Sequence, residues 1–300
     1  MTGSVFIFGL GYSARAFATK MRDNGWQVSG TTRSAEKEEG LRALGFEPFL
    51  YNGLPNSAVS AELQSADVIL VSIAPDPDGA EAGLPFGGDP VLRDFASVIK
   101  LLPKKPWLGY LSTVGVYGNH DGAWVKETTK CRPVSKRSRA RVAAEQAWID
   151  MADAADFPLG IFRLSGIYGP GRNPLEKVAR GAGRRIDKPG QVFNRIHVDD
   201  IATALVSAVE KRAPGIFNIT DDEPAPPQNV VEYAAKLLDL DVPPLIPFDE
   251  ADLSPMGRSF YGENKKVSNA KSKEILAMNY SVPDYRAGMQ RALSDFRQKQ

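Results

Sequence analysis

Short apolar runs alternate with amphipathic segments along the first half of the chain. Five apolar runs are typical of strands buried on both faces, and they cover residues 4–10, 26–31, 47–51, 67–73 and 107–112. Four segments between them carry apolar residues at helical spacing, and they cover residues 13–24, 35–44, 58–64 and 90–102. Strands that alternate with crossover helices are typical of a parallel sheet. The pattern therefore predicts an α/β fold with a doubly wound parallel sheet.

The second half of the chain is more varied. The glycines and prolines of residues 165–171 indicate a loop. The remaining elements predicted here are a helix at 135–153, a strand at 158–164, a strand at 192–198, a helix at 199–211, a strand at 215–220 and a helical tail after the proline-rich stretch 223–228. We expect residues 1–165 to form the main domain and residues 192–220 to return to it. Residues 166–191 and 221–300 are then expected to form a smaller lobe.

The composition limits the partners of this protein. Its 37 basic and 36 acidic residues leave a formal net charge of +1, so no overall field favours nucleic acid or an anionic membrane. The apolar start of the chain lacks the basic segment of a secretory signal. A single cysteine, Cys131, excludes an internal disulfide, and no Cys/His cluster indicates a metal site. We expect a cytoplasmic protein with a small-molecule substrate, without a nucleic-acid or membrane partner, and with a homodimer as one option for its assembly.

A glycine-rich turn follows the first predicted strand and opens the first predicted helix. In this context Gly9 permits a tight turn, Gly11 lets the backbone approach a pyrophosphate, and Ala14 keeps the helix close to the sheet. The helix N-terminus adds amide donors and partial positive charge for that phosphate. We therefore predict a nicotinamide dinucleotide site, and the alternative is an ordinary helix cap. The cofactor-binding residues predicted in this turn are Gly9, Gly11, Tyr12, Ser13 and Ala14.

The end of the second predicted strand distinguishes the two nicotinamide dinucleotides. A protein that binds NAD usually has a carboxylate about 20 residues beyond the glycines, which holds the ribose 2′-hydroxyl. Here Thr32, Arg33 and Ser34 occupy that place. Arg33 offers a fork of donors to a 2′-phosphate, and the two hydroxyls can add contacts. We therefore favour NADP over NAD as the cofactor; in the alternative, Arg33 faces solvent.

Two more segments are assigned to the cofactor. Ile73 and Ala74 follow the fourth predicted strand, at the sheet edge where ligands bind in this architecture. They are predicted to line the adenine or the ribose, and a plain turn is the alternative. Ser112, at the end of the fifth predicted strand, is also placed in the cofactor site.

Several later motifs resemble those of one family. They are Leu-Ser-Thr-Val-Gly-Val-Tyr-Gly at 111–118, Arg-Leu-Ser-Gly-Ile-Tyr-Gly-Pro-Gly at 163–171, Arg-Ile-His-Val-Asp-Asp-Ile-Ala at 195–202 and Phe-Asn-Ile at 217–219. With the glycine turn, and in this order, the chain resembles the extended and atypical short-chain dehydrogenase/reductases, a group of NAD(P)-dependent sugar epimerases and dehydratases. The resemblance implies a Rossmann-type sheet with a smaller C-terminal α/β lobe that binds the substrate.

The resemblance also implies roles at an active site. In the family, a Ser or Thr four residues before the Tyr of the Val-Tyr-Gly motif orients the substrate, and Thr113 takes this position. The Tyr-x-x-x-Lys pair that transfers the proton falls on Arg137 and Arg141 when the helix is aligned by its residues 142–145. A guanidinium keeps its proton at physiological pH, so Arg137 cannot replace the Tyr as an acid/base. Arg141 can still hold the ribose or a phosphate.

Other side chains are candidates for the missing acid/base. Glu127 is assigned to the catalytic set with Thr113, and His120, Tyr117 and Tyr168 are further options. Each has a plain alternative: Glu127 as a solvated loop carboxylate, His120 as a surface residue and the two tyrosines as packing.

A cationic stretch at residues 130–141 lies at the expected mouth of the site. It predicts either recognition of an anionic substrate, such as a nucleotide sugar or a carboxylate, or a solvated helix face paired with Glu145. The residues predicted to bind substrate are Thr113, Tyr117, Tyr168, Arg172 and Arg195.

These observations lead to two functional hypotheses. The first is an NAD(P)-dependent oxidoreductase or epimerase with a non-standard active site, acting on a small polar anion. The second is a non-catalytic NADP-binding sensor or regulatory protein that lost the proton-transfer pair. Nucleic-acid binding is disfavoured, because the total charge is near zero and the cationic stretch lacks interleaved aromatic residues.

Overall fold

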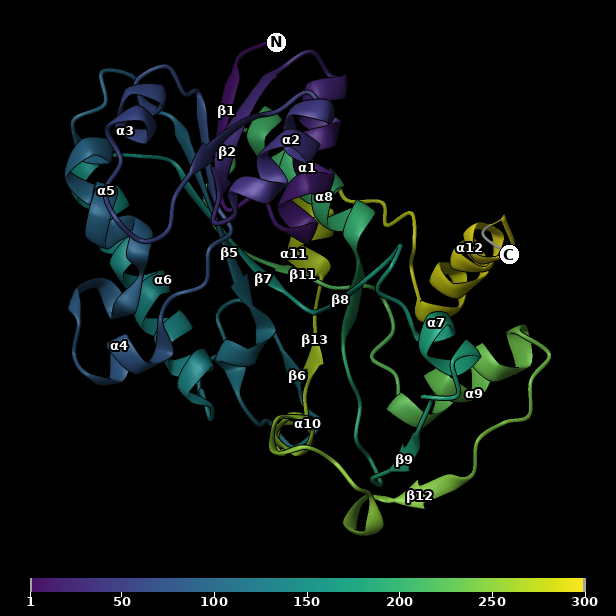
Figure 1. Ribbon diagram of the computed structural model, residues 1–300. Helices are drawn as coiled ribbons and strands as arrows, with labels where there is room; N and C mark the ends of the chain where they lie inside the picture. The colour runs from purple at the N-terminus through teal and green to yellow at the C-terminus, as the bar shows by residue number, and fades with distance from the viewer. Residues whose placement is uncertain (1, 299–300) are drawn as a thin grey trace.

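A seven-stranded parallel sheet forms the centre of the protein (Figure 1). The structure is a computed structural model and describes residues 2–298. The strand order is β11-β7-β5-β4-β1-β2-β3, and every neighbouring pair is parallel. The strands are β1 (Ser4–Phe8), β2 (Gln27–Thr32), β3 (Glu47–Leu50), β4 (Val68–Val71), β5 (Trp107–Thr113), β7 (Leu159–Leu164) and β11 (Gly215–Ile219). This confirms the predicted α/β fold with a doubly wound parallel sheet.

Helices cover both faces of this sheet, as Figure 1 shows. Successive side chains of a strand point to opposite faces, and in β1 Val5 and Ile7 enter one hydrophobic core while Phe6 and Phe8 enter the other. The first core is shared with α1 (Tyr12–Asp23) and α8 (Val198–Glu210). The second is shared with α3 (Ser57–Leu63), α5 (Pro90–Lys100) and α6 (Lys136–Ala155). Strands buried on both faces explain the continuous apolar runs of the sequence.

The direction of the sheet reverses at β1. The chain runs outward from β1 to β2 and β3, and then continues on the other side of β1 with β4, β5, β7 and β11. In an open parallel sheet, such a switch point leaves a crevice at the carboxyl ends of the strands. Here it brings the turn after β1 against the loop after β4: a Cβ built on Gly9 would lie 2.9 Å from Ile73 Cγ1.

One predicted strand lies elsewhere. Residues 192–198 contain β10 (Arg195–His197), which pairs with β8 (Gly166–Tyr168) in a separate two-stranded sheet. The predicted loop at 165–171 therefore includes a short strand, and the prediction that 192–198 returns to the main sheet is wrong. The physical reason is that β11 already pairs with β7, so that edge of β7 is not available to β10.

The last third of the chain contributes to two parts of the molecule. Three helices share a small hydrophobic cluster; they are α7 (Pro174–Ala179), α9 (Pro227–Leu237) and α12 (Tyr285–Gln298). Nearby, β9 (Arg185–Asp187) pairs with β12 (Leu245–Pro247). In contrast, β13 (Lys266–Val267) pairs with β6 (Trp124–Val125), and residues 276–280 after α11 (Ala270–Ile275) place Leu276, Met278 and Tyr280 in the core beside α8. Residues 221–300 are thus more interleaved with the main domain than the sequence predicts, because this apolar segment packs on the sheet.

Two short helices lie near the carboxyl ends of the strands. They are α4 (Pro77–Glu81), after β4, and α10 (Pro255–Phe260). Within residues 2–298, no helix combines the length and the apolar character needed to cross a bilayer.

Candidate active site

The two glycines of the turn after β1 are needed for different reasons. Gly9 has φ +90°, and its N–H donates to Thr31 Oγ1 at 2.8 Å. A side chain there would be strained and would collide with Ile73. Gly11 has φ −82°, and a Cβ on it would have Gly9 O, 4.0 Å away, as its nearest neighbour. The protein itself therefore leaves space in front of Gly11, as a closely approaching ligand requires.

Helix α1 begins with amides that no side chain caps. Gly11 is its N-cap residue and forms no side-chain cap hydrogen bond, and Tyr12, Ser13 and Ala14 form the first turn. Such an N-terminus attracts an anion through its N–H groups and the helix dipole. The residues of this turn therefore fit the diphosphate of a dinucleotide, and we expect Gly11, Tyr12, Ser13 and Ala14 to hold it.

The predicted ribose-binding residues follow β2. The Ser34 N–H donates to Thr32 Oγ1 at 3.3 Å, so this hydroxyl already stabilises the turn. Arg33 is exposed, and among the ion pairs of residues 2–298 none includes it. Thr31, which the sequence analysis did not select, is buried and holds the glycine turn in place.

Three other predicted cofactor residues differ in their surroundings. Ile73 is partly buried beside Gly9, and Ala74 is exposed on the wall of a cavity. Ser112 is buried, and its hydroxyl donates to Glu145 Oε1. Its side chain therefore points into the protein, away from the crevice.

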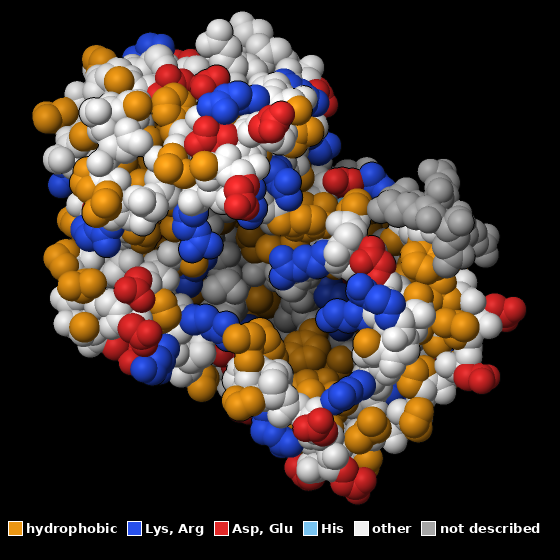
Figure 2. Space-filling view, in the orientation of Figure 1, with side chains coloured by type: hydrophobic (Ala, Val, Ile, Leu, Met, Phe, Trp, Pro, Cys, Tyr) orange, Lys and Arg blue, Asp and Glu red, His pale blue; other side chains and the backbone are white. Residues whose placement is uncertain are grey.

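A cavity of about 1100 Å³ opens at the carboxyl ends of the strands, between the sheet domain and the helices α7 and α9. Figure 2 shows it as the hollow at the centre of that face. The predicted residues that it brings together are Ala74, Thr113, Arg137, Arg141, Tyr168, Arg172 and Arg195. The lining residues that sequence reasoning missed include Ser135, Ser138, Ser165, Lys177, Arg180, Phe193, Phe260, Tyr261 and Lys265.

The hydroxyls of Thr113 and Ser138 lie on either side of Gly115, at the end of β5. Thr113 Oγ1 accepts a hydrogen bond from the Gly115 N–H at 3.1 Å. The position of a Cβ on Gly115 would be 3.0 Å from Ser138 Oγ and 3.4 Å from Thr113 Oγ1, so both hydroxyls flank the same glycine. Ser135 Oγ donates to Ser138 Oγ at 2.9 Å. The cavity therefore contains a short chain of hydroxyls beside Thr113.

The two arginines at the positions of the family's Tyr and Lys both reach the cavity from α6. Arg141 donates through Nη1 to the Leu111 carbonyl oxygen at 2.5 Å and to the Tyr110 hydroxyl at 3.1 Å. Arg137 is exposed, and its contact is a weak one from Nη1 to Met256 Sδ at 3.8 Å. Arg141 is thus fixed on the end of β5, while Arg137 extends from the first turn of the helix.

The sequence left two interpretations of the cationic stretch open, recognition of an anion or a solvated helix face with ion pairs, and the cations of the stretch divide between the two. Lys136 and Arg139 form ion pairs with Glu81 of α4, at 2.8 Å and 2.6 Å. Glu145, which was expected to pair with this stretch, instead binds Arg163 of β7. One side of α6 is therefore a paired outer face, and Arg137 and Arg141 face the cavity.

Three predicted residues are held outside the cavity lining. Tyr117 is 0% exposed and its hydroxyl donates to Asn218 Oδ1 at 2.7 Å; burial raises the pKa of Tyr117 to about 12. Its assignment as a substrate-binding residue is corrected, because its side chain is enclosed by the protein. Glu127 Oε1 accepts the Asn218 N–H at 2.9 Å, and a ring nitrogen of His120 lies 3.1 Å from the Tyr117 carbonyl oxygen. Glu127 thus ties its loop to β11, His120 bonds within the loop that follows β5, and neither lines the cavity with Thr113.

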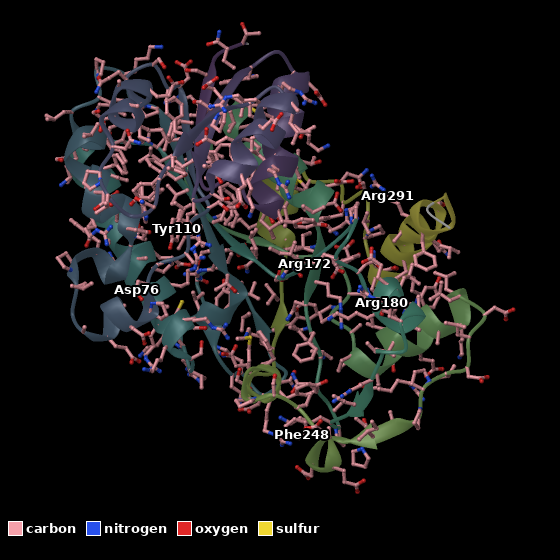
Figure 3. The ribbon with its side chains drawn as sticks, in the orientation of Figure 1. Asp76, Tyr110, Arg172, Arg180, Phe248 and Arg291 are labelled. Atoms are coloured by element: carbon pink, nitrogen blue, oxygen red, sulfur yellow. The ribbon has the colours of Figure 1, made fainter. Side chains whose placement is uncertain are left out.

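The other predicted substrate residues line the cavity. The Tyr168 hydroxyl donates to the Asp284 carbonyl oxygen at 3.2 Å, and burial raises its pKa. Arg195 donates to the carbonyl oxygens of Phe193 and Ala225 at 2.9 Å and 3.2 Å, and burial lowers its pKa. Arg172 lies with its guanidinium carbon 5.9 Å from the centre of the Tyr12 ring, and Figure 3 shows it between the sheet domain and the helix that carries Arg180.

Positive charge dominates the cavity. Its acidic lining residues are Glu176 and Glu263, and its basic ones are Arg137, Arg141, Arg172, Lys177, Arg180, Arg195 and Lys265. Lys and Arg side chains are visible around the central hollow in Figure 2. A surface of this kind favours an anionic ligand.

Comparisons with known proteins agree with this architecture. The profile of the NAD dependent epimerase/dehydratase family matches residues 95–220. A functionally unknown conserved protein from Silicibacter pomeroyi DSS is 46% identical, with a TM-score of 0.88 over 98% of this chain and 99% of that one. Protein YeeZ of Escherichia coli (strain K12) is 28% identical over 287 residues, which are 93% of this chain and 96% of that protein. UDP-N-acetylglucosamine 4-epimerase from Bacillus cereus shares the fold, with a TM-score of 0.78 at 13% identity over 98% of this chain and 99% of that one.

Proposed function

Since residues 95–220 match the profile of the NAD dependent epimerase/dehydratase family, we propose that this chain is a member of that family and an NADP-dependent oxidoreductase that works as a reductase on a small organic anion. The observation that carries the proposal is the position of the cationic cavity. It begins at Thr113, at the carboxyl end of β5, in the same sheet edge as the uncapped N-terminus of α1. This edge is where a dinucleotide and its substrate meet in a doubly wound fold.

The residues in the first turn of α6 suit the reduction of a carbonyl group. A reduced nicotinamide dinucleotide, when bound, supplies the hydride. The acceptor carbon of a carbonyl substrate then gains two electrons and one hydrogen, the C=O π bond breaks, and the oxygen must receive a proton. Arg137 cannot accept a proton, but its fixed positive charge can stabilise negative charge that develops on that oxygen. The cation stabilises this oxygen whichever way the hydride moves, and in this proposal the supply of reduced cofactor makes the reaction a reduction.

The hydroxyl chain can supply the proton. Thr113 Oγ1 accepts the Gly115 N–H, so its own O–H is left to donate to a substrate oxygen. Ser138 Oγ accepts from Ser135 Oγ and can likewise donate forward. Ser135 is partly exposed and can be reprotonated from water. In this proposal Thr113 and Ser138 hold the oxygen, and Ser135 connects it to solvent.

The preference for NADP is part of the same proposal. Arg33 extends into solvent at the end of β2, next to β1 in the sheet, and no carboxylate of residues 2–298 pairs with it. A 2′-phosphate would supply that partner. Arg141 can add a contact to the ribose from its anchored position on Leu111.

Binding and turnover test the proposal separately. NADPH binding should be measured by calorimetry for the wild type and for Gly11→Val, whose side chain would enter space that no protein atom fills. We expect Gly11→Val to lower the affinity at least about 100-fold, because it blocks the approach of the diphosphate, while its melting temperature stays near that of the wild type. Unchanged NADPH affinity in Gly11→Val would refute the site.

Turnover should be screened with aldehyde and ketone acids by the loss of NADPH absorbance. Once an active compound is found, Ser138→Ala should lower kcat about 100-fold, in the range of general acid catalysis, and Ser135→Ala should lower it less. Full activity in both variants would refute the hydroxyl chain.

The non-catalytic sensor remains the second candidate, and one feature favours it: neither Arg137 nor Arg141 can transfer a proton. Tight NADPH binding without turnover of any carbonyl acid would support the sensor over the reductase.

A further inference from the structure

The cations of the cavity have few partners in the protein. Arg137, Arg172, Lys177 and Arg180 line it, and among the ion pairs of residues 2–298 none includes any of the four. Arg180 donates through Nε to the Glu176 carbonyl oxygen at 3.0 Å, and that leaves its terminal nitrogens for another acceptor. An anion in the cavity would receive charge-assisted hydrogen bonds without displacing a protein carboxylate.

Several neutral polar side chains of the cavity away from the hydroxyl chain are already committed. Asn194 donates to the Lys265 carbonyl oxygen and accepts the Val267 N–H. Asn173 caps α7 through the Glu176 N–H, and Ser259 Oγ donates to the Met256 carbonyl oxygen. Of the hydroxyl chain, Ser135 donates to Ser138, and the O–H groups of Thr113 and Ser138 are left for the reacting oxygen. A ligand with many hydroxyl or amide groups would therefore find few free partners, and leaving such groups unpaired is costly.

The wall away from the sheet is apolar and aromatic. Phe193 and Tyr261 meet edge to face with ring centres 5.2 Å apart, and Phe260, at the end of α10, is 56% exposed beside them. Further apolar lining residues of this wall are Val192, Val230, Val231 and Leu253. In Figure 2 hydrophobic side chains line the lower part of the central hollow, below the cations. This wall, which we call the aromatic wall, can bury a planar apolar group.

One polar group in the cavity lacks a partner. Ser165 is 5% exposed, and its buried hydroxyl forms no hydrogen bond within residues 2–298. It follows Leu164, which is in register with Thr113 on the neighbouring strand, so it lies at the end of the cavity nearest to the hydroxyl chain. A buried donor of this kind is expected to bond to a ligand or to water.

We propose that the cavity takes an aromatic carboxylate: its acid group binds among Arg172, Lys177 and Arg180, its ring packs on the aromatic wall, and a polar atom of the reacting end bonds to Ser165. This rests on the proposed reductase function and names the substrate class of the same site. The pattern of many free cations, few free neutral partners and an apolar wall suits such an anion better than a nucleotide sugar, whose hydroxyls and base need several hydrogen bonds.

Calorimetric binding to the NADP-loaded protein tests the assignment with trans-cinnamate, cinnamyl alcohol and UDP-glucose as probes. We expect trans-cinnamate to bind at least about tenfold more tightly than the uncharged alcohol, the effect of a charge-assisted hydrogen bond. The double variant Arg172→Gln/Arg180→Gln should remove that difference. Phe260→Ala should weaken both cinnamyl probes about fivefold, because they share the ring.

Matched variants separate binding from folding. Arg132→Gln removes a cation of the same stretch outside the cavity lining, and Trp124→Ala removes an aromatic side chain of similar exposure, 60%, also outside it. Neither should change the affinity for trans-cinnamate. All variants should be compared by melting temperature, and since Phe260 and Arg180 are exposed, we expect them to stay folded.

Three outcomes would count against the assignment or its premise. Equal affinity for trans-cinnamate and cinnamyl alcohol, or tighter binding of UDP-glucose than of trans-cinnamate, overturns it. Tight NADPH binding without any trans-cinnamate binding overturns it and leaves the proposed reductase intact. Absence of NADP and NADPH binding overturns the proposed function, and with it the identification of aromatic acids as substrates.

Discussion

Two charged side chains of α6, Glu145 and Arg137, behave in opposite ways. Glu145 and Arg163 form a buried pair with Nη2 and Oε2 2.7 Å apart, and the Ser112 hydroxyl also donates to Glu145. Arg137, two helical turns before Glu145, has no carboxylate partner among residues 2–298 and faces the cavity. The same contrast separates Arg163 from Arg180, which is exposed and lines the cavity.

The difference shows how the protein divides its charges between folding and binding. A buried charge must be paired, because losing its hydration is costly. The pair at Glu145 joins α6 to β5 and β7 and thereby holds the helix that carries Arg137 and Arg141. Arg137, Arg172 and Arg180 in the cavity are exposed, so these cations can stay without a partner until an anion binds. In these two places the paired charges therefore belong to the scaffold, and the unpaired cations line the cavity.

Removing one member of the buried pair should have the largest effect. Glu145→Gln leaves Arg163 buried without a countercharge, and we expect a loss of about 3–5 kcal/mol in the free energy of unfolding. Urea denaturation followed by circular dichroism measures it. The double variant Glu145→Gln/Arg163→Met should lose less than the single one, because the uncompensated charge is gone. A loss below about 1 kcal/mol in Glu145→Gln would contradict the contrast between the two groups.

Asp221 is a buried carboxyl without an ion pair in the described part of the chain, so it combines the burial of Glu145 with the missing partner of Arg137. Its Oδ2 has no hydrogen-bond partner within residues 2–298. Burial raises the pKa of Asp221 to about 8, against the opposing attraction of Arg195. The unfolded chain loses this proton near pH 4. Between about pH 4 and pH 8 the folded state therefore binds the proton more strongly, and the stability falls as the pH rises.

Replacing this carboxyl by an amide should remove the pH dependence that it causes. We expect Asp221→Asn to be more stable than the wild type by roughly 1–3 kcal/mol at pH 8 and equal to it near pH 4. Melting temperatures measured across this range check the result. Parallel curves for the two proteins would show that Asp221 has an ordinary pKa.

Arg33 extends the contrast to the cofactor side of the sheet. If it is an unpaired cation that awaits a phosphate, Arg33→Ala should weaken NADPH binding about tenfold and leave NADH binding nearly unchanged. Calorimetry with both nucleotides measures the ratio, and Arg42→Ala, on the neighbouring helix α2 (Glu38–Ala43) and already paired with Glu38, is the control. Equal losses for both nucleotides would remove the 2′-phosphate assignment.

The smallest change in the free energy of unfolding is expected when a cation of the cavity is replaced. Arg180→Gln should change the free energy of unfolding by less than about 0.5 kcal/mol, because an exposed cation without an ion pair contributes little to folding. The same urea titration that measures Glu145→Gln provides the comparison. A loss of 2 kcal/mol or more would mean that Arg180 belongs to the scaffold.

The sequence by itself determined the parallel sheet, the glycine turn and the positions of Thr113, Arg137 and Arg141. Each of these depends on neighbouring residues: strands and helices on the period of apolar side chains, and the turn on two glycines within three positions. These features could be predicted because the information is local.

Tertiary structure decided which side chains face the cavity. Tyr117 bonds to Asn218, 101 residues away, and Glu127 binds the backbone of the same residue, so both leave the predicted site. Arg180 directly after α7 and Phe260 at the end of α10 enter it from helices with little sequence signal, since both helices have six residues. No local sequence pattern encodes these long-range contacts. The direction of a side chain depends on how distant segments pack against each other, and on the cost of leaving a buried polar group unpaired.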